Sequence, residues 1–223
     1  MTRLPADRRS FKKRIIQTAI ILLVIVIVVG VRLVEEIGQE PSLADRFVVV
    51  KVIDGDTVEL AGGDRLRLLA VDTPEEGELF HDEATDFLRS LVLGQSVTIE
   101  FASRRRDRYG RLLGFVFEDT LFVNKAILDN GLGYLYLFED DDLNRPEIER
   151  MLQAQRAALT TGVGIWSLER VPEDYYINID GSLRFHRPGC RSVSRVKPGE
   201  YRRFSTREEA LMLGLSPCRN CRP

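Results

Sequence analysis

Residues 54–75 read DGDTVELAGGDRLRLLAVDTPE, and this stretch decides the fold because it holds two turns and most of the strands that they join. Asp54-Gly55 is typical of a tight hairpin turn. Ala61-Gly62-Gly63-Asp64 predicts a second turn a few residues later. The sequence therefore predicts three consecutive strands before any helix, over residues 47–53, 57–60 and 65–71.

The chain after this stretch alternates between helical and extended patterns. Residues 79–92 predict an amphipathic helix, because apolar side chains recur there at helical spacing. Further strands and helices are predicted over 97–101 (strand), 112–117 (strand), 123–130 (helix) and 146–161 (helix). Five strands with a helix between the third and the fourth predict an α+β protein built on a five-stranded OB-type β-barrel, a fold that often binds oligonucleotides.

The formal net charge of −2 hides a strong partition along the 223 residues. Residues 1–32 and residues 175–223 each carry a net charge of +6, whereas residues 33–174 carry −14. Basic ends beside an acidic middle suggest that the basic tail binds a polyanion and that the middle needs a cation to hold one. Most of the acidic residues are expected to be solvated surface groups.

The N-terminal segment combines a basic cluster with an apolar run. Residues 1–14 hold six Lys and Arg residues, and residues 15–31 have no charged side chain. These 17 residues reach about 25 Å as a helix, and Arg14 and Arg32 extend them toward the ~30 Å hydrocarbon core. We predict a cytoplasmic basic segment over 1–14 and a single-pass transmembrane anchor over 15–34.

The side of the membrane follows from the positions of the basic residues. Because they precede the apolar run, we expect a cytoplasmic N-terminus, a linker over 35–45 and extracytoplasmic domains beyond it. A cleaved signal peptide is the alternative. Its apolar core is normally shorter, and Val28-Val29-Gly30-Val31-Arg32 is a poor cleavage site.

The chemistry concentrates in five charged residues. Hydrolysis of a phosphodiester needs an attacking water and positive charge beside the phosphoryl oxygens. Asp56 and Asp72 are ligands that a hard divalent cation prefers, in a weak site completed by backbone carbonyls and water. Glu75 can act as general base on a water. Arg67 and Arg111 can each offer a forked donor pair to phosphate oxygens. We therefore predict Arg67, Glu75 and Arg111 as catalytic residues.

Strand geometry places one condition on this site. Arg67 and Asp72 are five positions apart, so an unbroken strand would point them to opposite faces. The strand must therefore end or bulge before Asp72, as Pro74 suggests.

Four motifs over residues 45–168 resemble the staphylococcal nuclease (thermonuclease) family. They are IDGDT (53–57), RLLAVDTPE (67–75), DRYGR (107–111) and GIW (164–166). The resemblance implies a Ca²⁺-dependent endonuclease that acts on DNA and RNA from an OB-type barrel, breaks the P–O5′ bond and leaves 3′-phosphates. It implies that Asp56, Asp72 and the Thr73 carbonyl bind calcium and that Arg108 and Tyr109 bind a substrate phosphate.

One position departs from the family pattern. Where the family has a lysine and then a tyrosine near the substrate base, this chain reads Tyr134-Leu135-Tyr136-Leu137, which leaves the stacking residue open. The alternative function is a non-catalytic surface receptor that captures nucleic acid, for example for DNA uptake. Such a module usually loses one or more of the five charges, and this chain keeps them all.

The C-terminal residues predict a second metal site. His186 and Cys190 form an H-x3-C pair, and Cys218 and Cys221 form a C-x2-C pair. Four N and S ligands in two close pairs suit a closed tetrahedral Zn²⁺ site that staples a small domain. The alternative is a Cys218–Cys221 disulfide with a free Cys190.

Residues 175–223 also resemble the zinc-binding domain of Ada-type methylphosphotriester repair proteins. That family uses four cysteines and transfers a methyl group to the first, whereas this chain has His186 there, so methyl transfer is not implied. We expect a structural zinc module, rich in arginine, that helps to dock nucleic acid. Residues 46–170 would form the nuclease-like domain that precedes it.

Overall fold

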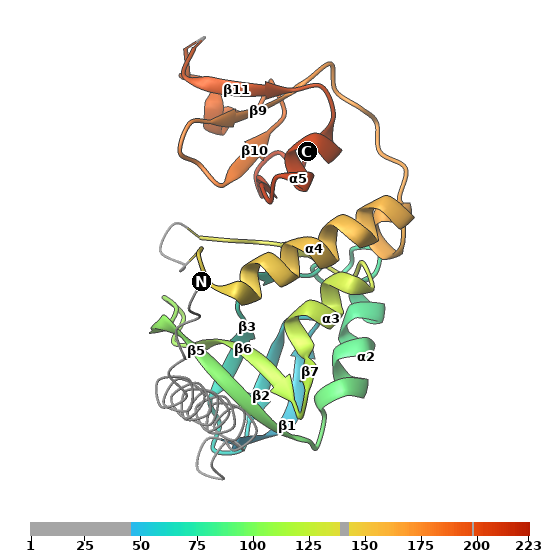
Figure 1. The fold of residues 1–223 in the computed structure, drawn as a ribbon, viewed down its shortest axis with the longest axis vertical. Coiled ribbons are helices and arrows are strands. Elements are labelled where there is room, and N and C mark those ends of the chain that lie inside the picture. Colours follow the sequence, from blue (N-terminus) through green and yellow to red (C-terminus); the bar gives the residue numbers. More distant parts are fainter. Residues whose placement is uncertain (1–45, 139–142, 198) are drawn as a thin grey trace, which may run out of the picture. The chain divides into compact units, whose positions relative to one another are not determined.

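A computed structural model describes residues 46–138, 143–197 and 199–223 (Figure 1). The described residues all belong to one compact unit. The predicted basic segment (1–14), membrane anchor (15–34) and linker (35–45) lie outside the described residues. Among the residues that the structure describes, no helix is both long and apolar enough to cross a membrane.

The first half of the compact unit is a closed β-barrel. Its strands are β1 (Arg46–Asp54), β2 (Thr57–Leu60), β3 (Arg65–Leu68), β5 (Ser96–Arg106) and β6 (Leu112–Glu118). They follow the order β3-β2-β1-β5-β6, and a parallel pairing of β3 with β6, Leu66 opposite Leu112, closes the barrel. The prediction of a five-stranded barrel in an α+β protein is confirmed, and β7 (Leu121–Phe122) adds a short strand beside β6.

Three helices pack against the barrel (Figure 1): α2 (His81–Val92), α3 (Val123–Asp129) and α4 (Pro146–Thr161). Ala84, Leu88 and Val92 form the buried stripe of α2, which packs against β1. The helix begins at His81, two residues later than predicted, because Phe80 adopts a left-handed conformation with φ of 70°.

Asn124, on α3, is a fully buried polar side chain in the barrel half. Its Oδ1 accepts a hydrogen bond from the Val116 amide (2.9 Å), and its Nδ2 donates to the Leu69 carbonyl (2.8 Å). Leu69 lies in the turn that carries the chain from β3 toward Asp72. Asn124 therefore ties this turn to β6.

We expect Asn124→Ala to lower the free energy of unfolding by about 2–4 kcal/mol, because two buried backbone groups lose their partner at about 1–3 kcal/mol each. The control is Lys125→Ala on the same helix, which removes only a surface ion pair with Asp129 (2.6 Å) and is expected to cost less than about 1 kcal/mol. Urea unfolding measures both. Equal stability of the two variants would contradict the role assigned to Asn124.

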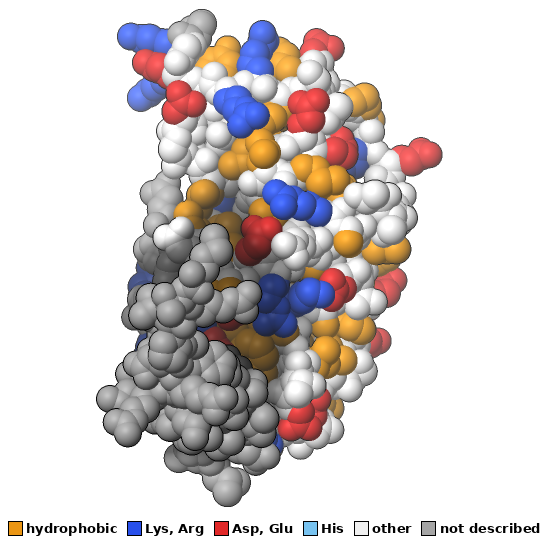
Figure 2. Space-filling view, viewed as in Figure 1, with side chains coloured by type: hydrophobic (Ala, Val, Ile, Leu, Met, Phe, Trp, Pro, Cys, Tyr) orange, Lys and Arg blue, Asp and Glu red, His pale blue; other side chains and the backbone are white. Residues whose placement is uncertain are grey.

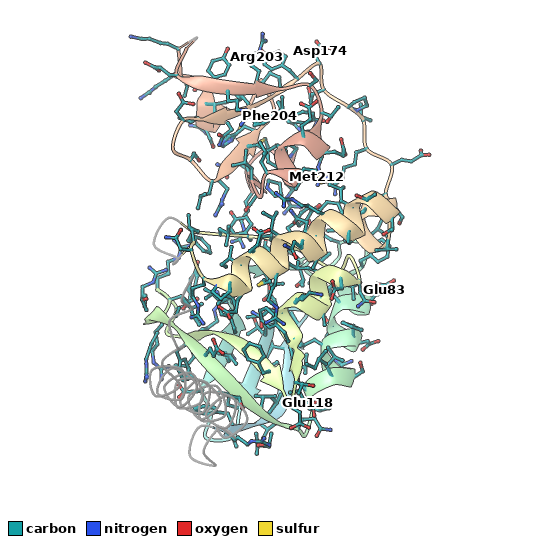
Figure 3. All side chains as sticks on the ribbon, in the orientation of Figure 1. Glu83, Glu118, Asp174, Arg203, Phe204 and Met212 are labelled. Carbon is teal, nitrogen blue, oxygen red and sulfur yellow. The ribbon has the colours of Figure 1, made fainter. Side chains whose placement is uncertain are left out.

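The second half of the compact unit, here called the C-terminal module (residues 175–223), has its own sheet and core. Strands β9 (Tyr176–Ile179), β10 (Arg184–His186), β11 (Tyr201–Phe204) and β12 (Ser216–Pro217) follow the order β11-β9-β10-β12, beside helix α5 (Arg207–Met212). Arg203 and Phe204 are neighbours on β11 (Figure 3), but Arg203 is exposed and Phe204 is buried. The neighbours Tyr176 and Ile177 on β9 are both buried, so apolar side chains cover both faces of the sheet there.

Buried hydrogen bonds join the C-terminal module to the barrel half. The side chain of Gln155, on α4, accepts from the Leu135 amide (2.8 Å) and donates to the Leu211 carbonyl (3.1 Å). Ser216 donates through Oγ to the Leu135 carbonyl (2.9 Å). Gln155 and Ser216 are fully buried, so both would leave unpaired polar groups if the halves separated.

Candidate active site and metal cluster

The turn after β1 places Asp56 in the interior, where only 3% of the residue is exposed. Its carboxylate accepts hydrogen bonds from the Thr57 hydroxyl (2.9 Å) and the Thr73 amide (3.3 Å). Gly55 lets the turn approach its neighbours, since a Cβ there would lie 2.7 Å from the Ala84 Cβ and 2.8 Å from the Thr73 hydroxyl. The turn is therefore held tightly around a buried carboxylate.

Arg67 bridges the two predicted metal carboxylates. One end of its guanidinium is paired with Asp56, and Nη2 donates to Asp72 Oδ1 and to the Val71 carbonyl, both at 3.0 Å. Strand β3 ends at Leu68, and Ala70 has a left-handed φ of 61° before β4 (Val71–Asp72) begins. This break confirms the condition set by strand alternation and returns Asp72 to the side of Arg67.

Negative charge is concentrated around this turn. Burial, together with the neighbouring Asp56 charge, raises the pKa of Asp54. Burial also raises the pKa of Asp72, although Arg219 and Arg67 oppose it. A hard cation would relieve both effects, so the donor set of buried carboxylates beside the Thr73 backbone fits calcium. The sequence predicts only a turn at Asp54. Its position two residues before Asp56 is the signal that could have identified it as part of this carboxylate cluster.

The second basic motif forms a small paired unit. Asp107 accepts hydrogen bonds from Arg111 Nε (2.8 Å) and from the Arg111 amide (3.0 Å). Burial alone would raise the pKa of Asp107, but these hydrogen bonds outweigh it and lower that pKa. The guanidinium carbons of Arg111 and Arg108 lie 5.4 Å and 4.8 Å from the centre of the Tyr109 ring. The motif therefore presents two arginines around one exposed aromatic ring.

One cavity of about 840 Å³ brings most of the predicted site together. Glu75 is exposed at its edge, and no described side chain pairs with its carboxylate. The predicted residues that line this cavity, here called the catalytic cavity, are Asp56, Arg67, Thr73, Glu75, Arg108, Tyr109 and Arg111. Asp72 lines a neighbouring cavity of about 400 Å³ instead and is connected to the first through Arg67.

The two tyrosines of the 134–137 segment have different surroundings. Tyr136 lines the catalytic cavity. Tyr134 packs edge-on against Trp166, with ring centres 5.1 Å apart, and its hydroxyl accepts from Arg207 (2.9 Å) and Arg170 (3.0 Å). Tyr136 is therefore the tyrosine positioned beside the catalytic groups, and Tyr134 supports the C-terminal module.

The predicted zinc ligands come together in the C-terminal module. The ligand atoms of His186, Cys190, Cys218 and Cys221 all lie within 4.8 Å of one another, and all three cysteines are free thiols. His186 Nδ1 is buried without a hydrogen-bond partner. Burial and the neighbouring Cys190 and Cys218 sulfurs raise the pKa of Cys221 to about 12. An orphaned imidazole nitrogen and three crowded sulfurs fit a tetrahedral cation such as Zn²⁺.

Comparisons with known proteins find relatives among nucleases. The family described as Staphylococcal nuclease homologue matches residues 65–168. An uncharacterized endonuclease of Escherichia coli O157:H7 is 34% identical over 123 residues, which are 53% of this chain and 75% of the relative. Thermonuclease of Staphylococcus hyicus is 29% identical over 170 residues, 70% of this chain and 99% of the relative.

A third relative matches a larger part of this chain. Endonuclease YhcR of Bacillus subtilis (strain 168) is 31% identical over 209 residues, which are 83% of this chain and 17% of that protein. With the carboxylates, arginines and glutamate of its motifs gathered around one barrel face, the chain belongs to the staphylococcal nuclease homologue family.

Proposed function

We propose that this chain is a Ca²⁺-dependent endonuclease that hydrolyses phosphodiester bonds of DNA and RNA at the P–O5′ bond. The observation that carries the proposal is the catalytic cavity, where the buried Asp56 lies beside Arg67 and where Glu75 and Arg111 line the same space. Endonuclease and thermonuclease relatives support the reaction class. Calcium dependence and the identity of the cleaved bond are inferred from the family resemblance.

We assign a separate role to each group of predicted site residues. Asp56, Asp72 and the Thr73 carbonyl would hold the calcium ion, which when bound supplies positive charge beside the phosphoryl oxygens. Arg67 and Arg111 bind those oxygens as charge develops on them. Glu75 is exposed, and no side chain in the described part of the chain pairs with its carboxylate, so it is free to take a proton from the attacking water. Arg108 and Tyr109 bind a substrate phosphate, and Tyr136 lines the same cavity.

We propose in addition that His186, Cys190, Cys218 and Cys221 bind one structural Zn²⁺. Four protein ligands close the coordination sphere and leave no position for an activated water. The ion would therefore stabilise the C-terminal module rather than take part in hydrolysis. Its support is the convergence of four ligand atoms around an unpartnered His186 nitrogen.

The experiment that tests the nuclease proposal also tests the alternative of a non-catalytic receptor. Purified full chain is incubated with supercoiled plasmid in calcium or in EGTA. We expect nicked and then fragmented plasmid in calcium only. Plasmid that is retained by the protein but stays intact in calcium would support the receptor and overturn the nuclease.

We propose that the chain is anchored by residues 15–34 with its N-terminus in the cytoplasm, so that residues 46–223 lie outside. The support is the six Lys and Arg residues that precede Ile15 against the single Arg32 that follows the apolar run. An extracytoplasmic location would also supply enough free calcium for a weak site.

Protease added to intact cells or spheroplasts is expected to remove the nuclease domain, because an extracytoplasmic domain is accessible from outside. Immunoblotting against the C-terminal module follows the loss. A cytoplasmic protein of the same cells serves as the control and stays intact. Protection of the C-terminal module until the cells are lysed would reverse the predicted topology.

A further inference from the structure

Arg219 connects the C-terminal module to the nuclease site. It lies between the two predicted zinc ligands of the C-x2-C pair, 147 residues after Asp72, yet its guanidinium is ion-paired with Asp72 Oδ1. The guanidinium carbon also lies 4.6 Å from the centre of the Tyr136 ring. A residue of the metal cluster loop therefore reaches both a predicted calcium ligand and the aromatic wall of the catalytic cavity.

The loop that carries Arg219 is fixed on both sides. The Cys218 amide donates to the Phe185 carbonyl (3.0 Å), and the Arg222 amide donates to the Cys218 carbonyl (2.8 Å). The Arg222 side chain is ion-paired with Glu78 of the barrel half. Arg219 is thus presented by an ordered turn, and not by a free chain end.

Arg219 also lies at the boundary between the catalytic cavity and the neighbouring cavity. Thr73, Pro74, Glu75 and Arg219 line both the catalytic cavity and the neighbouring cavity of about 400 Å³. The neighbouring cavity is lined by two further arginines, Arg170 and Arg222. A nucleic-acid chain whose scissile phosphate lies at Arg67 and Glu75 carries its next phosphate one nucleotide further along the strand. Arginines that line the adjoining cavity suit that phosphate.

The pairing with Asp72 is exchangeable. Arg67 and Arg219 donate to the same oxygen, Asp72 Oδ1, so the carboxylate has two arginine partners. The Arg219 side chain is 53% exposed, so its guanidinium can turn toward solvent, whereas the Asp72 side chain is only 16% exposed. A cation bound at Asp72 would compete with Arg219 for the carboxylate, while the Tyr136 ring would keep the guanidinium above the cavity.

On the face drawn in Figure 2, Lys and Arg side chains are interspersed with Asp and Glu. We propose that Arg219 is a third phosphate-binding arginine of the nuclease site, contributed by the C-terminal module, and that it binds the phosphate next to the scissile one. This inference rests on the proposed nuclease function.

The test compares Arg219→Ala and Arg219→Lys with Arg195→Ala in the full chain. Arg195 is an exposed arginine of the same module that lines neither cavity, so its removal changes the net charge equally. Binding of a fluorescent single-stranded 10-mer is measured in calcium, with Glu75→Gln introduced into every protein to slow cleavage. We expect Arg219→Ala to weaken binding about tenfold, as for the loss of one charge-assisted hydrogen bond. The salt slope should fall by about one unit.

Cleavage of the same 10-mer by proteins with Glu75 intact completes the test. Arg219→Ala is expected to lower kcat/KM about tenfold, mainly through KM, with Arg219→Lys in between and Arg195→Ala unchanged. Equal binding and cleavage by the Arg219 and Arg195 variants would overturn the inference. Faster cleavage by Arg219→Ala at low calcium would also overturn it and identify Arg219 as a plug on the calcium site. A wild-type chain that does not cleave in calcium would instead reject the proposed nuclease function.

Discussion

Glu75→Ala and Arg111→Ala are each expected to slow calcium-dependent cleavage by about 100–1,000-fold, the usual effect of removing one preorganised electrostatic group from an active site. Glu75 presents an exposed carboxylate at the edge of the catalytic cavity, and Arg111 is held there by Asp107. Single-turnover rates on a short oligonucleotide measure the effect without product release. Arg67→Ala should be as inactive, but it also leaves the buried Asp56 without its arginine partner.

Matched controls separate this loss from a general effect of charge. Glu83→Ala removes a carboxylate from the exposed side of α2 (Figure 3), and Arg195→Ala removes an arginine from the C-terminal module. Both should cleave at the wild-type rate. Turnover close to wild type in folded Glu75→Ala and Arg111→Ala proteins would reject the assignment of the active site.

Cys221→Ser is expected to remove one equivalent of zinc and to unfold the C-terminal module, because metal binding by a small stapled domain is folding free energy. Apparent binding free energies of structural Zn²⁺ are about 10–16 kcal/mol, more than a small apolar core supplies. The module has two small buried clusters: Tyr176, Phe185, Phe204, Ala210 and Leu211 in one, and Ile177, Cys190, Val193 and Cys218 in the other. Metal analysis beside a thiol titration measures the loss, with Ser194→Ala as a folded control.

The effect of zinc loss on cleavage follows from Arg219. A zinc ion that is only structural would leave hydrolysis of short substrates unchanged, but Arg219 of the module contacts Asp72. We therefore expect Cys221→Ser to reduce cleavage by about the same factor as Arg219→Ala and not to abolish it. A wild-type protein without zinc and with a Cys218–Cys221 disulfide would reject the metal site. Complete inactivity of Cys221→Ser on a dinucleotide-sized substrate would contradict a purely structural zinc.

Local sequence patterns predicted the barrel and most of the site. Turn residues and alternation located the strands, and the five-residue spacing of Arg67 and Asp72 required the break that Ala70 provides with its φ of 61°. These features depend on neighbours in the chain, so the sequence contains them. The four ligands of the metal cluster were equally visible, because their two short spacings restrict the geometry.

Contacts between distant segments were not predictable in this way. The Arg219–Asp72 pair joins residues 147 positions apart, and no local pattern indicates that the metal loop reaches the barrel. The burial of Gln155 was not predictable either, because a glutamine on a helix is usually solvated. In the structure its side chain is fully buried and hydrogen-bonded to both halves. Its surroundings are created only when the C-terminal module folds against α4.

The most direct test of the proposed calcium-dependent nuclease is the calcium dependence of the single-turnover cleavage rate in wild type and in Asp56→Asn. Asp56 is the buried carboxylate proposed to bind the calcium ion. Asparagine has the same shape as aspartate but carries no charge. We predict that the wild-type rate rises with calcium to a plateau and that Asp56→Asn needs at least about tenfold more calcium, since one charged ligand is lost. Identical calcium curves, or cleavage by the wild type in EGTA, would contradict the account.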